Sequence, residues 1–194
     1  RARLTPEGRG RSYAHVQDAI GRMVKLLDAV AAIEAATPES VAVHPTPVDL
    51  EELVEHVVAQ LQKETNAEQT ISVIITGQRR VTTLDSTLLH WALEQVLHNA
   101  IKFSSPRSAI QIDLDYHPGA VEFRVIDHGI GIPEADQTLL FENFGRARNV
   151  STIPGVGLGL ALTKHWVEML GGTIAFTSEE RVGTTFILAF PLSS

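Results

Sequence analysis

The chain has 194 residues, of which 44% are hydrophobic and 20% charged, and its formal net charge at pH 7 is -7. This length and composition predict a globular protein that buries one substantial core, with room for a smaller helical appendage. The acidic balance excludes a nucleic-acid binder, since no stretch concentrates enough Lys and Arg to neutralise many phosphates. The absence of cysteine excludes disulfides and cysteine-ligated metals. No apolar run is long enough to span a bilayer, and no signal-peptide pattern occurs.

The first 36 residues carry the pattern of a bundle helix. Their apolar residues recur at spacings of three and four, namely Tyr13, Val16, Ile20, Met23, Leu27 and Val30. This rhythm is typical of a helix that packs against other helices, although packing against the following domain would produce it too. Prolines between residues 37 and 47 predict that the helix ends there and that a semi-extended linker follows. We therefore expect a helical segment at 1–36, a linker at 37–47 and a larger domain at 48–194.

The larger domain begins with a helix and two β-rich segments. Asp49 is a candidate N-cap and Glu52 follows at the capping-box spacing, which predicts a helix. The buried stripe of this helix is formed by Leu50, Leu53, Val54, Val57, Val58 and Leu61. Segments 71–76 and 80–84 are rich in β-branched residues, and the short connection between them predicts a hairpin or two neighbouring strands. Asp85 predicts the N-cap of the next helix.

The second half of the domain returns to strands. Alternating apolar and polar residues predict an antiparallel pair around the turn at 118–119, with Asp127 at the C-terminal end of its second strand. The elements expected next are a short helix at 133–144, an irregular loop at 145–154, a helix at 158–170 and a strand pair at 173–177 and 184–190. The predicted fold class is therefore α/β (α+β), a two-layer sandwich with helices on one side of a mixed, mainly antiparallel sheet.

The helix expected after Asp85 is unusual because of the polar residues on its outward face. Between residues 89 and 103 the apolar positions share one broad helical face, whereas Gln95, His98, Asn99 and Lys102 share the opposite one. A solvated surface would explain such a stripe. Two glycine clusters further along the chain, which a surface helix does not require, favour a binding site instead.

The glycine clusters are DHGIG at 127–131 and GVGLGL at 155–160. Neither fits the common phosphate loops, because no GxxxxGK[ST] string occurs and Leu160 stands where the Rossmann fingerprint needs its third glycine. Glycines at alternate positions let a backbone pass close to a planar base or a polyphosphate. The second cluster also opens a helix, whose N-terminal amides favour anions. The two clusters together predict a nucleotide site on neither of the two common folds.

These motifs resemble those of the ATP-binding domain of sensor histidine kinases. In chain order, the resemblance rests on HNAIKFS (N box), DHGIGIP (G1 box), FENFGR (F box), GVGLGLAL (G2 box) and the pair Gly183 and Thr184. Each motif alone is weak, but all of them in this order match strongly from about Pro47 onward. The resemblance implies the Bergerat fold, which these kinases share with DNA gyrase B subunits and mismatch-repair ATPases. The helix within 13–36 resembles the second helix of the dimerisation and phosphoacceptor domain.

The resemblance implies ATP as the nucleotide and Mg²⁺ as its metal. Asp127 would accept a hydrogen bond from the exocyclic amine of adenine, which guanine does not offer. Asn99 would be the magnesium ligand, with Gln95 and Lys102 as the other catalytic positions. Lys102 and Arg146 would contact the phosphates, although a surface salt bridge explains each of them as well. The further nucleotide-binding positions implied are Phe103, Gly129, Gly131, Ile132, Phe144, Gly155, Gly157, Leu158, Gly159, Leu160 and Thr184.

The resemblance also implies a lid and raises the question of the acceptor histidine. The loop at 145–154 would be the ATP lid, ordered by nucleotide and floppy without it. Gln95 and His128 depart from the family pattern, in which Asn is common at both positions. In the family the phosphoacceptor histidine lies in a helix, with an acidic neighbour and a proline several residues later. None of the eight histidines here, His15 included, has these surroundings. We therefore expect the acceptor helix upstream of Arg1, in a longer protein.

The implied function is the catalytic part of a sensor histidine kinase, which transfers the γ-phosphoryl of Mg-ATP to a histidine outside this chain and then to a response regulator. The implied partners are ATP or ADP, a second copy through the N-terminal helix, and a receiver domain, without nucleic acid or membrane contact. The expected location is cytoplasmic, as a separate protein or as part of a membrane-anchored sensor. The alternatives are an anti-sigma-type serine kinase and a degenerate kinase that acts as a nucleotide-controlled binding module.

Overall fold

The computed structural model describes residues 42–65, 68–150, 153 and 156–192. The bundle helix predicted within 1–36 and the nucleotide position predicted at Gly155 lie outside the described residues. The helices of the described part are α2 (Leu50–Thr65), α3 (Ser86–Phe103) and α4 (Gly159–Met169), with two short 3-10 helices, η1 (Glu134–Leu139) and η2 (Arg148–Val150). The strands are β1 (Thr46–Val48), β2 (Thr70–Thr76), β3 (Thr82–Leu84), β4 (Ala109–His117), β5 (Ala120–Asp127), β6 (Thr173–Glu179) and β7 (Gly183–Pro191).

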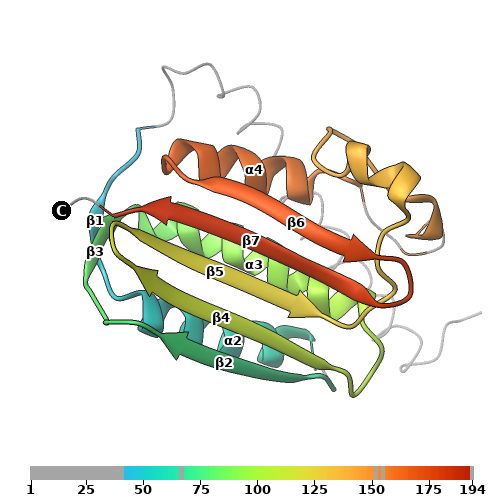
Figure 1. The fold of residues 1–194 in the computed structure, drawn as a ribbon, viewed down its shortest axis with the longest axis horizontal. Helices are drawn as coiled ribbons and strands as arrows, with labels where there is room; N and C mark the ends of the chain where they lie inside the picture. The colour runs from blue at the N-terminus through green and yellow to red at the C-terminus, as the bar shows by residue number, and fades with distance from the viewer. Residues whose placement is uncertain (1–41, 66–67, 151–152, 154–155, 193–194) are drawn as a thin grey trace, which may run out of the picture. The chain divides into compact units, whose positions relative to one another are not determined.

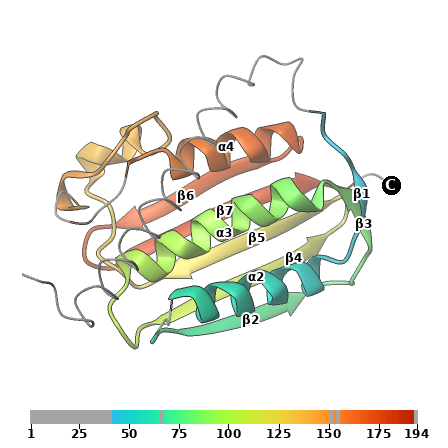
Figure 2. The same cartoon turned by 180° about the vertical axis from the view of Figure 1, so that it is seen from behind.

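The domain is a two-layer sandwich. Five strands form one sheet in the order β2-β4-β5-β7-β6 (Figure 1). All neighbours in this sheet are antiparallel except β2 and β4, which run parallel. Helices α2, α3 and α4 cover one face of the sheet, as the view from behind shows (Figure 2). The predicted fold class is confirmed, and the sheet is mainly antiparallel because most of its strands follow each other through short turns.

The core lies between the helices and the sheet. The inward residues of β5, Val121, Phe123 and Val125, are fully buried, as are Leu89 and Val96 of α3. Their spacing is two in the strand, and in the helix it keeps them on one stripe, so each element presents one apolar face to the other. The side chains of Phe123 and Phe190 meet edge to face with ring centroids 6.0 Å apart. The predicted apolar stripe of α3 is thus the part of the helix that fixes its position on the sheet.

Both predicted N-caps are present. Asp85 Oδ1 accepts hydrogen bonds from the amides of Thr87 at 3.0 Å and Leu88 at 3.2 Å, at the start of α3. Asp49 Oδ1 accepts from the amides of Glu51 at 3.2 Å and Glu52 at 3.4 Å, at the start of α2. These carboxylates satisfy donors that have no partner within the helix, and they define where each helix begins.

The prediction that 71–76 and 80–84 form a hairpin or two neighbouring strands is wrong. The first segment is β2, which pairs with β4 in parallel, and the second is β3, which pairs with β1 in a separate two-stranded sheet. β1 includes Thr46 and Pro47, which the sequence assigns to the linker. Gly77 redirects the chain after β2 with a φ of +83°, and a Cβ on this residue would stand 2.2 Å from the carbonyl oxygen of Tyr116. Because the chain turns away beside β4 at this point, β3 cannot fold back onto β2.

The region between β5 and α4 is less helical than predicted. Of the segment expected as a helix at 133–144, only Glu134–Leu139 is helical, and it is a 3-10 helix. The expected irregular loop contains one further 3-10 turn at Arg148–Val150. Phe141 lies half-buried against Phe176, with ring centroids 5.7 Å apart, as expected of a core residue. A 3-10 turn suits a short segment that is pinned at both ends by tertiary contacts.

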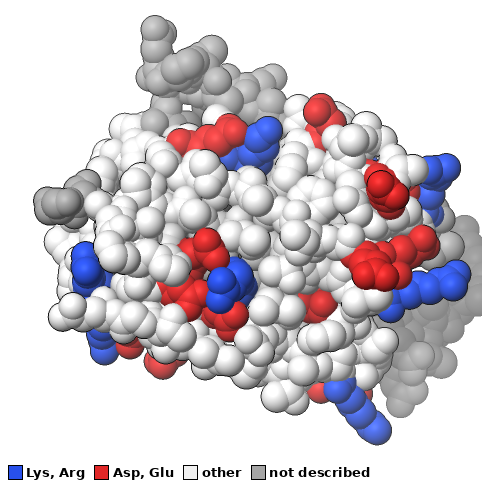
Figure 3. All heavy atoms as spheres, viewed as in Figure 1, with Lys and Arg blue, Asp and Glu red and all other residues white. Residues whose placement is uncertain are grey.

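The outer face of the sheet carries no helix in the described part of the chain. Its charged side chains gather over β4 and β5 (Figure 3), where Arg124 forms ion pairs with Asp113 at 3.3 Å, Asp115 at 2.5 Å and Glu122 at 3.2 Å. No helix in the described ranges is both long and apolar enough to cross a membrane.

Candidate active site

The site is built around Asp127, the last residue of β5. Its side chain is only 7% exposed. One carboxylate oxygen, Oδ1, accepts hydrogen bonds from the amides of Gly129 at 2.8 Å and Thr184 at 3.3 Å. The other oxygen, Oδ2, receives no hydrogen bond from the described residues. Burial raises the pKa of Asp127, and the two amide donors act against that rise. The carboxylate is therefore held in one orientation with one acceptor oxygen available for a ligand.

The glycines after Asp127 are required by close approach to protein backbone. A Cβ on Gly129 would stand 2.4 Å from the carbonyl oxygen of Phe103, and a Cβ on Gly131, whose φ is +61°, would stand 1.9 Å from that of Glu179. The amide of Ile130 donates to the same Phe103 oxygen at 3.1 Å. The loop is therefore wedged between the end of α3 and the end of β6. Contacts with protein backbone therefore account for both glycines, and their predicted role beside a ligand stays a prediction.

Thr184 is joined to the opposite side of this loop by a residue that the sequence did not single out. The hydroxyl of Ser178 accepts from the amide of Ile132 at 2.9 Å and lies 2.9 Å from the hydroxyl of Thr184. Gly183 precedes Thr184 with a φ of +145°, and a Cβ there would stand 2.0 Å from the carbonyl oxygen of Asp127. The predicted positions Ile132 and Thr184 are thus brought together through Ser178, beside Asp127.

Helix α3 supplies the polar stripe of the site. Gln95, Asn99 and Lys102 are half-buried, whereas His98 of the same stripe is exposed. The side-chain amide of Asn99 makes no hydrogen bond with any residue that the structure describes. Gln95 lies against the start of α4, because a Cβ on Gly159 would stand 2.8 Å from Gln95 Oε1. Gly159 therefore allows the first turn of α4 to approach the polar stripe of α3.

The site has two basic side chains, Lys102 of this stripe and Arg146 of the predicted lid. Lys102 Nζ is 5.0 Å from the ring centroid of Phe103 and forms no ion pair with a carboxylate among the described residues. Burial lowers the pKa of Lys102, and the positive charge of Arg146 lowers it further. Arg146 Nη2 donates to the carbonyl oxygens of Val150, at 2.7 Å, and Ile153. Two cations without a local counter-charge suit an anionic ligand, although Arg146 is also engaged by its own loop.

The N-terminal end of α4 offers further donors. Leu158, at the N-cap position, provides no side-chain hydrogen bond to the first turn, and no side chain of the described residues accepts from the amides there. Leu158 is buried and Leu160 half-buried, which fixes the helix start on the core. The φ of Gly157 is +79°, and a Cβ there would stand 2.7 Å from the carbonyl oxygen of Gly145. An eleven-residue helix with free N-terminal amides attracts phosphate.

The predicted lid is tied down by residues that sequence reasoning missed. Asp136, which is 5% exposed, accepts from the amide of Arg148 at 2.8 Å and from its Nε at 2.9 Å. Asn149 Nδ2 donates to the carbonyl oxygen of Gly131 at 2.9 Å. Phe144 has a φ of +64° and is 68% exposed. The described part of the lid is therefore bonded to the loop after Asp127, whereas the sequence predicted that nucleotide would order it.

The donor set of the site fits Mg²⁺ bound together with phosphates. No group of three or more His, Cys, Asp or Glu residues in the described ranges could hold a metal ion. Asn99, with its uncommitted amide oxygen, is the neutral ligand that the site offers. Mg²⁺ in nucleotide sites keeps waters and takes most of its remaining ligands from the substrate phosphates. A single protein oxygen on α3 is compatible with that arrangement.

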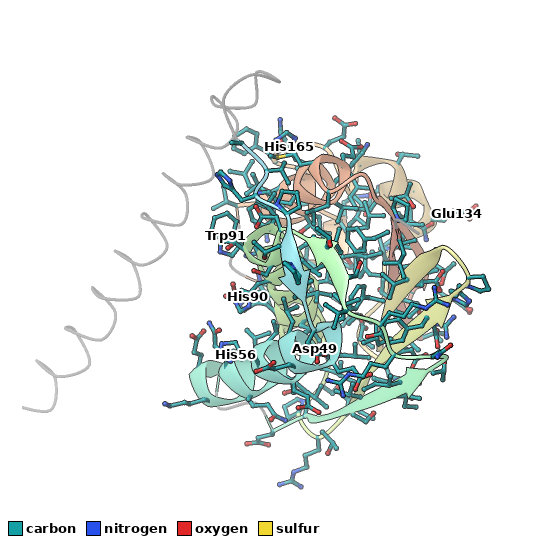
Figure 4. All side chains as sticks on the ribbon, turned by 90° about the vertical axis from the view of Figure 1, so that its left-hand side faces the viewer. Asp49, His56, His90, Trp91, Glu134 and His165 are labelled. Carbon is teal, nitrogen blue, oxygen red and sulfur yellow. The ribbon has the colours of Figure 1, made fainter. Side chains whose placement is uncertain are left out.

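A hollow lies on another part of the domain, away from Asp127. It has a volume of about 550 Å³ and is lined by residues of β1, α2 and α3 that include Asp49, His56 and His90. Figure 4 shows these residues near the start of α2 and along the neighbouring part of α3. The hollow contains none of the predicted site residues, so its chemistry is separate from that of Asp127.

This arrangement agrees with the comparisons to known proteins. The family of histidine kinase-, DNA gyrase B- and HSP90-like ATPases matches residues 84–194, which is more than half of the chain. The chain belongs to this family.

Several relatives of the chain are sensor kinases. The chain is 39% identical over 107 residues to the heme sensor protein HssS of Staphylococcus haemolyticus, which covers 55% of this chain and 23% of HssS. It is 42% identical over 110 residues to the sensor-like histidine kinase SenX3 of Mycobacterium tuberculosis, covering 55% of this chain and 27% of SenX3. The solved structure of the mycobacterial sensor histidine kinase MprB superposes with a TM-score of 0.67 at 29% identity, covering 77% of this chain and 98% of that one. The chain thus matches only about a quarter of the length of HssS or SenX3.

Proposed function

We propose that the chain is the ATP-binding and phosphoryl-transferring part of a sensor histidine kinase. The observation that carries the proposal is the buried carboxylate of Asp127, which is fixed through one oxygen and leaves the other free. The proposal is also supported by the membership of the chain in the ATPase family and by its similarity to sensor kinases. Because the matched segment is a small part of those relatives, the activity is proposed for this chain rather than taken from them.

Adenine would be recognised by Asp127. The free oxygen Oδ2 would accept a hydrogen bond from the exocyclic amine of adenine, whereas guanine presents a carbonyl oxygen at that position. Gly129 and Gly131 would act indirectly, because they allow the loop to close on Phe103 and Glu179 and so fix the carboxylate. Selectivity for adenine would then rest on one oxygen whose orientation is set by two backbone amides.

The triphosphate would lie between α3 and the start of α4. The free amides of the α4 N-terminus would bind phosphate oxygens, and Lys102 would add a charge close by. Arg146 would reach the phosphates from the lid. Mg²⁺, when bound with the nucleotide, neutralises phosphate charge, and Asn99 would hold it. The pKa of Lys102, lowered by burial and by Arg146, would return toward its usual value when phosphate anions bind.

The transfer step needs a neutral imidazole. Its unprotonated nitrogen would form a bond to the γ-phosphorus as the bond from that phosphorus to the β,γ-bridging oxygen breaks, and ADP would keep the electron pair of the broken bond. The proton on the other ring nitrogen could then leave to water. The protein would contribute by positioning and by charge stabilisation, so no residue of the chain has to abstract a proton. Gln95 cannot accept a proton near neutral pH, so it is compatible with a transfer step that needs no base from the protein.

We further propose that the complete protein is a homodimer that joins through the segment 1–36. It would lie in the cytoplasm, or face the cytoplasm from a membrane anchor, and it would pass the phosphoryl group to a response regulator. The support is the apolar pattern of that segment, which predicts a bundle helix, and the similarity of the chain to sensor kinases. The acceptor histidine would belong to a separate helix, since none of the eight histidines here has acceptor surroundings.

The test is incubation of the chain with γ-labelled ATP, Mg²⁺ and a separate fragment that carries an acceptor helix. We expect an acid-labile label on the fragment, and we expect Asn99→Ala to abolish it while the fold is retained. An acid-stable label would indicate a serine kinase. Nucleotide binding without any transfer would indicate a regulatory binding module, and either result would contradict the proposed function.

A further inference from the structure

Strand β2 (Thr70–Thr76) forms one edge of the five-stranded sheet (Figure 1). Its inner side pairs with β4, and the amide of Thr70 donates to the carbonyl oxygen of Ser108 at 3.2 Å. Backbone groups of successive residues in a strand point to opposite sides, so the even-numbered residues face β4. Ile71, Val73 and Ile75 therefore direct their N–H and C=O groups outward, where no described strand pairs with them.

This edge lacks the features that usually prevent sheets from joining. Its sequence TISVIIT has no charged residue and no proline, and its pairing with β4 continues without a bulge from Thr70 to Thr76. Ile74 and Ile75 are 44% and 38% exposed. Natural proteins commonly protect an edge with lysine, proline, a bulge or a very short strand. The other edge strand, β6, differs because it ends in Glu179.

The sequence of β2 complements itself when it is reversed. An antiparallel pair centred on Val73 places Val73 opposite Val73, Ile71 opposite Ile75 and Thr70 opposite Thr76. Only the pairing of Ser72 with Ile74 joins unlike residues. In the same register, every outward N–H and C=O of the three odd-numbered residues meets its counterpart, because opposite residues both face outward. A shift of the register by one residue would pair outward groups with inward ones.

We propose that β2 binds β2 of a second copy of this chain, antiparallel about Val73, so that the two sheets become one continuous sheet. None of these residues belongs to the candidate active site, so the proposal is independent of the proposed function. A single pair of edge strands buries less surface than the roughly 1,200 Å² of a stable protein interface. The association is therefore weak and depends on concentration, unless another contact between the copies supports it.

Single cysteines test the register, because the chain has no cysteine of its own. In Val73→Cys the two thiols face each other across a hydrogen-bonded pair with Cα atoms about 5.5 Å apart, within the range of a disulfide. In Ile71→Cys the two thiols lie about 13 Å apart along the ladder, which is too far. Under mild oxidation, we expect Val73→Cys to form covalent dimers at least about tenfold faster than Ile71→Cys.

Two further arms make the result specific. A mixture of Ile71→Cys with Ile75→Cys should cross-link although neither variant does so alone, because the register places those positions opposite each other. Equal rates for Val73→Cys and Ile71→Cys would overturn the proposal. Association through the predicted helix at 1–36 could not produce this pattern, since it would not depend on the position of the cysteine within β2.

Sedimentation analysis of the full chain gives an independent test. Ile74→Lys places a charge on the exposed side of the edge, and Val182→Lys is a matched control, because Val182 is 55% exposed in the turn between β6 and β7. The dimer proposed through 1–36 would also appear in sedimentation. We therefore expect Ile74→Lys to raise about tenfold the Kd of the further association through β2, and Val182→Lys to leave that Kd unchanged. Equal association of the two variants would overturn the proposal. Nucleotide affinity should not change in Ile74→Lys, so this result does not depend on the candidate active site.

Discussion

Replacement of Asp127 by asparagine tests how the site recognises its base. The side chain is 7% exposed, and Oδ1 is fixed by the amides of Gly129 and Thr184. An asparagine must direct its oxygen to these same two donors, because its amino group would oppose both of them. The amino group then occupies the place of Oδ2. It meets the exocyclic amine of adenine as donor against donor.

The expected loss can be estimated from the burial of this contact. A hydrogen bond to a charged group contributes about 1.5 to 3 kcal/mol, and each 1.4 kcal/mol is a factor of about ten in affinity. Water has little access to Asp127, so it cannot replace the lost partner. We expect the Kd for ATP to rise by about 10- to 150-fold in Asp127→Asn, measured by calorimetry. The preference for ATP over GTP should also shrink or reverse, since the asparagine amino group can donate to the carbonyl oxygen of guanine.

The fold should survive this substitution. Burial raises the pKa of Asp127, so the folded chain holds this proton more tightly than the unfolded chain does. The ionised carboxylate consequently lowers stability above its raised pKa, and this cost diminishes as the pH falls through that pKa. Asp127→Asn removes the cost and keeps both amide hydrogen bonds. The free energy of unfolding near neutral pH should therefore not decrease.

Asp113→Asn is the matched control. Asp113 is equally buried at 7% exposure, but it lies in β4 on the outer face of the sheet beside Arg124. We expect its folded fraction to bind ATP as the parent chain does. An unchanged Kd in Asp127→Asn, or the same loss in both variants, would refute the recognition of adenine by Asp127.

Three further predictions follow from the site. The chain should have negligible ATPase activity because Gln95 cannot accept a proton from water. Gln95→Glu should raise phosphate release while ATP affinity is retained. More hydrolysis in Gln95→Ala than in Gln95→Glu would contradict this explanation of the low activity. The chain incubated alone with saturating Mg-ATP should form no acid-labile phosphohistidine, and a label that His15→Ala removes would show that an acceptor was overlooked. Asp136→Asn should lower the protection of the amides at 146–150 against hydrogen exchange, because it weakens the bonds to Arg148. In the parent, protection relative to the intrinsic exchange rate at each pH should fall in the same way as the pH drops through the lowered pKa of Asp136. Unaltered protection in the variant would exclude Asp136 as the anchor.

Local patterns were sufficient for most elements of the fold. The alternation of β4 and β5, the stripe of α3 and the caps at Asp49 and Asp85 each depend on residues a few positions apart, and each was predicted. The partner of β2 was not, because parallel pairing with β4 joins segments about 39 residues apart across the whole of α3. Sequence proximity favoured a hairpin with β3, and only the tertiary structure shows that β3 joins β1 instead.

In the site, too, local sequence patterns predicted some residues, whereas contacts between distant segments were not predicted. The position of Asp127 at a strand end could be predicted from alternation, and its role from the order of the motifs. Ser178 could not, because it bonds to Ile132 across 46 residues and stands in β6 as one polar residue among several. The pair of Asp136 and Arg148 joins the short 3-10 helices η1 and η2, whose sequences show no periodicity, so no sequence signal distinguishes it from surface charge. The reason for the glycines also required the structure, since the backbone that they approach is distant in sequence.

We propose that ATP binds between α3, the start of α4 and Asp127. In a crystal structure of the chain with Mg²⁺ and a non-hydrolysable ATP analogue, we expect the exocyclic amine of adenine within about 3 Å of Asp127 Oδ2, as hydrogen bonding requires. Asn99 should bind the metal, and the phosphates should lie at the first turn of α4. A nucleotide bound instead in the hollow beside His56 and His90, or an adenine amine that faces another group, would contradict it.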